Sequence, residues 1–260
     1  MVSAVNPTVK AIAILIPGVL LGLTFDIYTP LVYLLFVFVV TLWLSDIPFK
    51  RWITFFAPFV LFIASFSWAR LLYTSDTFQG GSVLFSFWTF EVTTGGVAVA
   101  ISLALRSLCF IALSLLFILT TDSTKFMLSL MQQLKLSPKI TYGVLAGYRF
   151  LPTFKHELDV LRQAHRIRGV SRAKGIRGRI QQFKRYSIPL LANAIRKAER
   201  VANAMESKGF TGERDRTHYH MMTVTKRDWI FLGMMVGALL LTFATSYYFG
   251  YLNIFGHQFG

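Results

Sequence analysis

The chain has 260 residues, of which 54% are hydrophobic and only 15% are charged. This composition excludes an ordinary soluble domain, in which about a quarter of the residues are charged. The single cysteine, Cys109, excludes an internal disulfide, and the net charge of +15 is carried by one region: residues 121–227 hold 22 of the 27 Lys and Arg and 7 of the 12 Asp and Glu. A basic block therefore lies between apolar segments that together have no net charge.

The apolar segments are predicted to be membrane-spanning helices, since a helix needs about 20 apolar residues to cross the hydrocarbon core. The predicted spans are residues 11–25, 31–45, 52–73, 97–120 and 229–249. The first two are short, so we expect them either to tilt little or to form a hairpin that neighbouring helices partly shield.

The distribution of charge predicts which side of the membrane each connection faces. The connection at 46–51 carries Lys50 and Arg51, whereas segment 74–96 holds Asp76 and Glu91 and no basic residue. Basic connections face the cytoplasm. The sequence therefore predicts a membrane domain at 1–120, a cytoplasmic domain at 121–227, and a last span with a short external tail at 228–260. The fold class is an all-α, multi-pass membrane protein with about five transmembrane helices.

Arg106 is a charged residue well inside the fourth predicted span. A charge at this depth is costly and normally contacts protein or water. We expect Arg106 to pair with a carboxylate or a backbone carbonyl rather than to act in transport, because no second charge nearby suggests a relay.

The basic block has the pattern of amphipathic helices. A run of N-cap residues at 121–124 precedes a first helix, and Ser137 followed by Pro138 is typical of the start of a second. The second helix is predicted to continue to Arg168, where Gly169 supplies a C-terminal stop. Residues 170–186, rich in Arg, Lys and Gly, are predicted to form a solvated connection.

A third helix is predicted to start at Ser187-Ile188-Pro189 and to end at Lys208, followed by Gly209. Two helices of one block therefore end alike, each with a cation in the last turn and a glycine after it. A cation complements the helix dipole and glycine adopts the left-handed cap, so a single such end is ordinary. Two of them suggest a pair of contacts with two similar partner pockets. The candidate docking residues are Ile167, Arg168, Gly169, Ser207, Lys208 and Gly209.

Several short motifs give this region a specific resemblance. They are LTTDSTKF (119–126), LSPKI (136–140), YRFLPTF (148–154), RQAHRIRG (162–169), NAMESKGF (203–210) and, near the start, NPTVK (6–10). In these motifs the chain resembles EcfT, the transmembrane T component of energy-coupling factor (ECF) transporters, a class of ABC transporter. The similarity covers the basic block well and the spans only loosely.

The resemblance implies a non-catalytic subunit of a bacterial or archaeal cell membrane. In this family two coupling helices bridge two ABC-type ATPases to a small membrane protein, the S component, which binds a vitamin or a metal ion. An X-Arg-X motif at the end of each coupling helix docks into one ATPase. Arg168 matches the first motif; at the second the family usually has Arg, where this chain has Lys208. Lysine keeps the charge but loses the planar, two-pronged donor.

Other chemistry has little support in the sequence. There is no phosphate-binding Gly-rich loop and no catalytic pair, so neither ATP hydrolysis nor a cofactor is expected in this chain. His218 and His220 flank Tyr219, but no further ligands complete a metal site. The basic run 166–185 could contact anionic lipid. It has too few aromatic residues for nucleic-acid binding.

Two alternatives remain open from the sequence. A self-contained secondary transporter needs polar groups at mid-membrane and internal repeats, of which only Arg106 is seen. A membrane-anchored basic module would bind anionic lipid through the basic block, and it needs the apolar segments only as an anchor.

Overall fold

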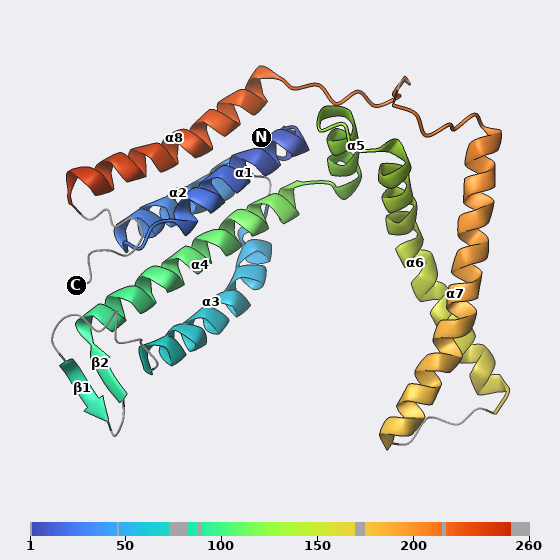
Figure 1. Cartoon of the computed structure of the whole chain (residues 1–260), viewed down its shortest axis with the longest axis horizontal. Helices are drawn as coiled ribbons and strands as arrows, with labels where there is room; N and C mark the ends of the chain where they lie inside the picture. Colours follow the sequence, from blue (N-terminus) through green and yellow to red (C-terminus); the bar gives the residue numbers. More distant parts are fainter. Residues whose placement is uncertain are drawn as a thin grey trace. The chain divides into compact units, whose positions relative to one another are not determined.

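The computed structural model describes residues 2–45, 47–72, 83–87, 90–169, 175–214 and 217–250 (Figure 1). The chain divides into two units. The first comprises Met1–Ser129 and Met222–Gly260, and the second is Leu130–Met221. This division by contacts does not test the predicted boundaries at 120 and 227, which concern membrane topology and stay predictions.

The first unit is built from helices. They are η1 (Val2–Ala4), α1 (Pro7–Gly22), α2 (Tyr28–Leu44), α3 (Phe49–Leu72), α4 (Thr94–Thr120), the greater part of α5 (Ser123–Gln133) and α8 (Lys226–Tyr248). A short antiparallel pair of strands, β1 (Val83–Phe87) and β2 (Phe90–Thr93), precedes α4 and was not predicted. The all-α membrane fold class is confirmed by the helices. Residues 74–82, 88 and 89 of the predicted outer segment 74–96 lie outside the described residues, as does the tail after 250.

Three described helices are long and apolar enough to cross a membrane, namely Phe49–Trp68 of α3, α4 and α8. The helices α1 and α2 have 16 and 17 residues, which gives lengths of only about 25 Å at 1.5 Å per residue. Both pack against α4 and α8. The prediction that the first two apolar segments are short is therefore confirmed.

The core of the first unit lies where α1, α2, α4 and α8 meet. Its fully buried side chains include Leu21, Tyr33, Leu116, Met235 and Leu239. The helix α3 packs on α4 and adds an aromatic cluster at its start. Trp52 stacks on Phe56 with ring centroids 4.4 Å apart and meets Phe38 of α2 edge-on at 4.3 Å.

Arg106 lies in α4 and is buried. Its Nη1 donates a hydrogen bond to the carbonyl of Gly22 at 3.1 Å, and its guanidinium lies 4.7 Å from the centroid of the Phe25 ring. The prediction of a structural pairing with a backbone carbonyl is confirmed. The contact holds the C-terminal end of α1 against α4.

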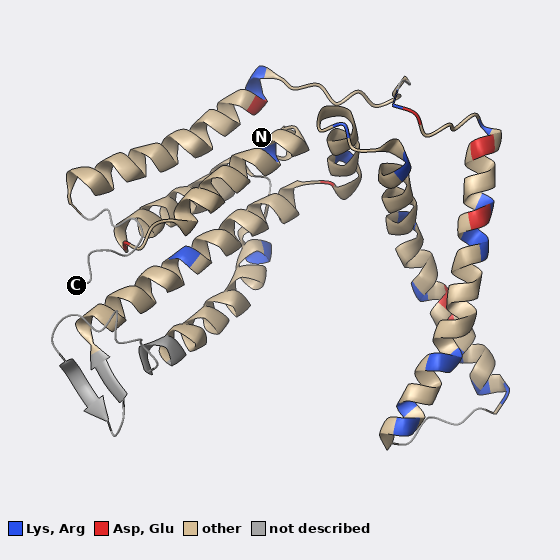
Figure 2. Ribbon diagram, in the orientation of Figure 1, with Lys and Arg blue, Asp and Glu red and all other residues tan. Residues whose placement is uncertain are grey.

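The two long helices of the second unit are α6 (Pro138–Ile167) and α7 (Gly175–Ser207). The start of α6 agrees with the prediction, because Ser137 is its N-cap and Pro138 its first residue. The start of α7 does not. The residues from 175 to 186, predicted as a connection, are helical, and Pro189 lies inside α7 rather than at its beginning. Many of the Lys and Arg positions that the structure describes lie along α6 and α7 (Figure 2).

Candidate docking tips and coupling-helix surface

The first candidate docking residue, Arg168, forms the C-cap of α6. Its N–H donates to the carbonyl of Ala164 at 3.2 Å. Gly169 follows with φ of +72°, and its N–H donates to Arg166 at 3.0 Å. A residue with a β-carbon is strained in this left-handed conformation, so glycine is needed there. The chain therefore turns sharply and leaves Ile167, 88% exposed, and Arg168 at the tip.

The second candidate, Lys208, occupies the same place at the end of α7. Gly209 has φ of +81° and donates to Glu206 at 2.9 Å, and the N–H of Phe210 donates to Met205 at 3.0 Å. These two hydrogen bonds form a Schellman motif. The ring of Phe210 then packs edge-on against Tyr142 of α6, with centroids 5.5 Å apart. The tip is thus fixed to the neighbouring helix, while Lys208 stays exposed.

The two tips lie at opposite ends of an antiparallel helix pair. Contacts between the helices run in reverse order, from Tyr142 with Phe210, through an ion pair of Glu157 with Lys197, to His165 beside Tyr186. Figure 1 shows the two helices crossing in this sense. Since α6 has 30 residues, its length separates the tips by about 45 Å. They cannot enter one pocket together, so the two tips would need separate contact sites if both dock to partners.

The electrostatic surroundings of the tips differ. Arg168 follows Arg166 and His165 in the last turn of α6, whereas Lys208 is close in sequence to Glu206. Neither cation has a side-chain hydrogen bond or ion pair with another residue that the structure describes. Both are therefore available to an acidic or carbonyl-lined groove of a partner, and a charge-assisted hydrogen bond is the strong kind.

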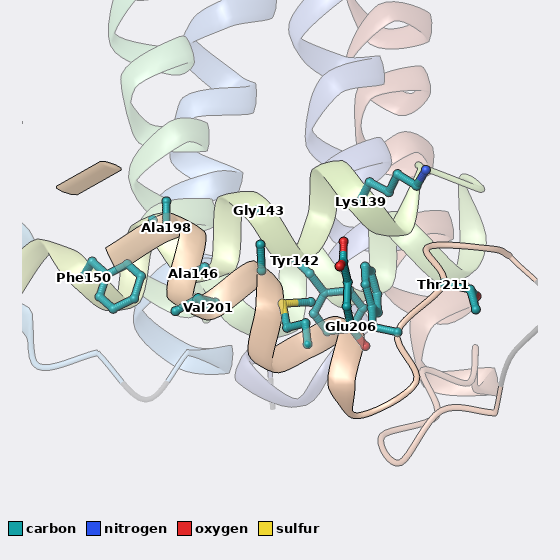
Figure 3. Close-up of a pocket in the computed structure, with 13 residues that line it drawn as sticks. Lys139, Tyr142, Gly143, Ala146, Phe150, Ala198, Val201, Glu206 and Thr211 are labelled. Atoms are coloured by element: carbon teal, nitrogen blue, oxygen red, sulfur yellow. The ribbon is translucent and has the colours of Figure 1, made fainter. Parts of the chain in front are cut away.

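A groove with a volume of about 530 Å³ lies between α6 and α7, close to the second tip. Gly143 and Ala146 of α6 and Ala198 and Val201 of α7 are among the residues that line it (Figure 3). Small side chains allow two helices to approach closely and leave room for a third. The sequence analysis did not predict this groove, although the small residues of α6 and α7 could have indicated it.

Large apolar side chains cover the outside of both helices. No residue of α7 is buried, and α6 buries only Pro138 and Thr141. An apolar surface of this extent is a candidate site for a binding partner. The exposed apolar residues include Ile140, Val144, Tyr148, Leu151, Ile180, Phe183, Ile188, Leu191 and Ile195.

A buried polar cluster at the start of α1 was missed by the sequence analysis. Asn6, Thr8 and Lys10 are buried, as is Asp228 at the start of α8. The sequence features that could have indicated the cluster were Lys10, close to the first apolar segment, and Asp228, an acidic residue at the start of the last one. The sequence analysis quoted residues 6–10 only as a motif of the family resemblance and did not single out Asp228.

The side chains that most often bind metals do not gather in any part of the chain that the structure describes. No group of three or more His, Cys, Asp or Glu side chains lies close enough there to hold a metal ion. The single Cys109 is buried.

Comparison with known proteins agrees with this architecture. The sequence profile of the CbiQ family, described as cobalt transport protein, matches residues 1–219. Three curated proteins named energy-coupling factor transporter transmembrane protein EcfT are similar to the chain. The one from Bacillus subtilis is 28% identical over 77% of each chain. The one from Exiguobacterium sibiricum is 30% identical over 76% of this chain and 77% of its own. The one from Limosilactobacillus fermentum is 27% identical over 82% of each.

Proposed function

The chain belongs to the CbiQ/EcfT family of transmembrane components of energy-coupling factor transporters, and on that premise we propose that it couples two ATPase subunits to a substrate-binding S component. The chain itself is a multi-pass protein of the cell membrane. In the proposal it hydrolyses no ATP and binds no solute. It transmits motion from the ATPases, which lie in the cytoplasm with residues 121–227, to the S component in the membrane. The transported solute is a vitamin or a metal ion.

The observation that carries the proposal is the pair of exposed cations about 45 Å apart at opposite ends of α6 and α7. Each tip is a helix end with an exposed cation and a glycine cap, so each presents the same chemistry to a partner. Two similar ATPase subunits offer two similar grooves. Ile167, Arg168 and Gly169 form one contact, and Ser207, Lys208 and Gly209 form the other. When the ATPases move together, the two ends of one rigid helix pair are displaced.

The subunit composition of the complex that copurifies with the chain tests this proposal directly. A tagged chain purified in mild detergent from its own host is expected to retain two ATPase subunits and one small membrane subunit. The chain alone in liposomes is expected to take up none of a panel of radiolabelled cobalt ion, biotin, riboflavin and thiamine. Uptake of any of these by the chain alone would instead support a self-contained secondary transporter. Purification without partners would contradict the proposal.

The S component is proposed to lie on the exposed apolar surface of α6 and α7. Leu191 and Ile195 are one helical turn apart on this surface and are 62% and 53% exposed. The groove lined by small residues lies between the same two helices. An apolar membrane protein can slide on such a surface, because the contact has few directional bonds to break.

Negative charge introduced on this surface is expected to release the S component while the ATPases stay bound. In a Leu191→Glu, Ile195→Glu variant, two carboxylates must be desolvated at the contact, which costs several kcal/mol. We expect at least a tenfold loss of the S component in pull-downs, with the ATPases retained. The matched control is Asn203→Glu, an exposed position on the same helix. Equal retention of the S component by the double variant and the control would exclude this surface.

A further inference from the structure

The start of α1 holds three polar side chains that are almost completely buried. Asn6, Thr8 and Lys10 have exposed fractions of 6%, 3% and 1%. Capping of α1 needs only one of them: Asn6 is the N-cap, and its side chain accepts a hydrogen bond from the N–H of Thr8 at 3.1 Å. The remaining polar atoms of this N-terminal polar cluster make contacts that are distant in sequence.

Each residue of the N-terminal polar cluster is bonded to a different part of the chain. Lys10 Nζ donates to the carbonyl and to Oγ1 of Thr120, at 3.1 and 3.2 Å. Thr8 Oγ1 donates to Ser129 Oγ at 2.8 Å. The backbone N–H of Asn6 donates to Asp228 Oδ1 at 2.8 Å, and its Nδ2 donates to the carbonyl of Thr223 at 3.3 Å.

These partners lie at the two places where the chain passes between the units. Ser129 is the last residue of the first unit before the coupling helices, and Met222, next to Thr223, is the first residue after them. Thr120 ends α4, which leads into the outgoing connection. Both covalent connections are therefore hydrogen-bonded to the same turn of α1. Force that reaches the first unit along the chain enters it at these points.

Helix α1 can carry a displacement further, because it is packed along its length. It contacts both α4 and α8, and Ala13 and Leu21 on it are completely buried. Close-packed helices transmit strain rather than absorb it. Buried hydrogen bonds are also costly to leave unmade, so the cluster resists separation from its partners.

We propose that Asn6, Thr8 and Lys10 are positioning residues for transport, which make both connections and α1 move as one body. This inference rests on the proposed coupling function. It adds that movement of the coupling helices acts on the membrane helices through the head of α1. Without the cluster, the connections would yield locally, and ATP hydrolysis would continue with less solute moved for each ATP.

The Thr8→Val variant tests this with little change of shape, since it removes only the hydroxyl that bonds Ser129. In complexes reconstituted in liposomes, we expect ATP hydrolysis per complex to be unchanged. The amount of radiolabelled solute moved per ATP, for whichever of cobalt ion, biotin, riboflavin and thiamine the complex carries, is expected to fall about five- to tenfold, within the usual range of coupling between sites. The control is Thr8→Ser, which keeps a hydroxyl and is expected to restore the ratio.

A cross-link provides the second test. The Thr8→Cys, Ser129→Cys variant places two thiols where the two hydroxyl oxygens are 2.8 Å apart. If the connection and α1 move as one body, the reduced form, which lacks the hydroxyl bond, moves less solute per ATP, and oxidation to the disulfide raises that ratio again. Loss of transport on oxidation, with recovery on reduction, would show that the contact must open and would overturn the proposal.

The outcomes separate this inference from the proposed function. If the unaltered chain does not assemble with ATPases, the proposed function fails. If it assembles and the Thr8→Val complex moves as much solute per ATP as the unaltered one, only the positioning role fails. If Thr8→Val lowers assembly, hydrolysis and uptake in the same proportion, the cluster is only structural and the positioning role fails as well.

Discussion

Replacement of both Arg168 and Lys208 by alanine is expected to abolish copurification of the two ATPases and, with it, solute uptake. Both side chains are exposed at the tips of α6 and α7 and have no partner among the described residues, so their removal leaves the unit itself intact. A hydrogen bond to a charged group is worth about 1.5–3 kcal/mol. Two such losses correspond to at least about a 100-fold weaker complex, since 1.4 kcal/mol is a factor of ten.

The single variants are expected to differ. Arg168→Ala removes a planar donor that can bind a carboxylate with two parallel hydrogen bonds, whereas Lys208→Ala removes a point charge. The first variant should therefore weaken docking more than the second. By the same argument, Lys208→Arg is expected to strengthen docking at the second tip.

The matched control for this experiment is Arg162→Ala. Arg162 is an exposed cation on α6, and it is paired with Asp159 at 3.2 Å. An exposed pair of this kind contributes about 0–1 kcal/mol, and it lies away from the tip, so docking should not change. Normal copurification of both ATPases with the Arg168→Ala, Lys208→Ala variant would refute the assignment of the tips.

Local sequence signals predicted the ends of the helices better than their continuity. Glycine caps at 169 and 209 follow from backbone sterics alone, and both have positive φ. Pro189 was misread as a helix start because proline is favoured in a first turn. In the structure it lies inside α7, where the amphipathic spacing of Ile176, Ile180 and Phe183 already indicated a helix upstream.

Tertiary contacts explain what the sequence could not show. Nothing in the sequence links Asn6 to Asp228 or Thr8 to Ser129, since these bonds join residues more than 100 positions apart. The antiparallel pairing of α6 and α7, which places the two tips at opposite ends, likewise depends on packing between helices. The sequence identified the docking residues as candidates, and the structure adds the spacing between them.

Asp228→Ala is expected to lower the free energy of unfolding of the first unit by about 3 kcal/mol, because it leaves a buried donor without a partner. The carboxylate of Asp228 accepts hydrogen bonds from the N–H of Asn6 at 2.8 Å and of Thr225 at 2.7 Å. It also accepts from the Thr225 hydroxyl at 3.0 Å. Asn6 is buried, so water cannot replace the lost acceptor there.

The comparison with Asp122→Ala shows whether burial is the cause. Asp122 also accepts a backbone N–H at a helix start, from Lys125 at 2.9 Å, but it is exposed. Loss of an exposed N-cap costs about 1 kcal/mol. Denaturation of both variants in detergent, followed by tryptophan fluorescence, should therefore show a difference of about 2 kcal/mol. Equal losses would mean that the cluster around Asp228 adds no more than an ordinary helix cap. The head of α1 would then be too weakly held to transmit movement from the coupling helices.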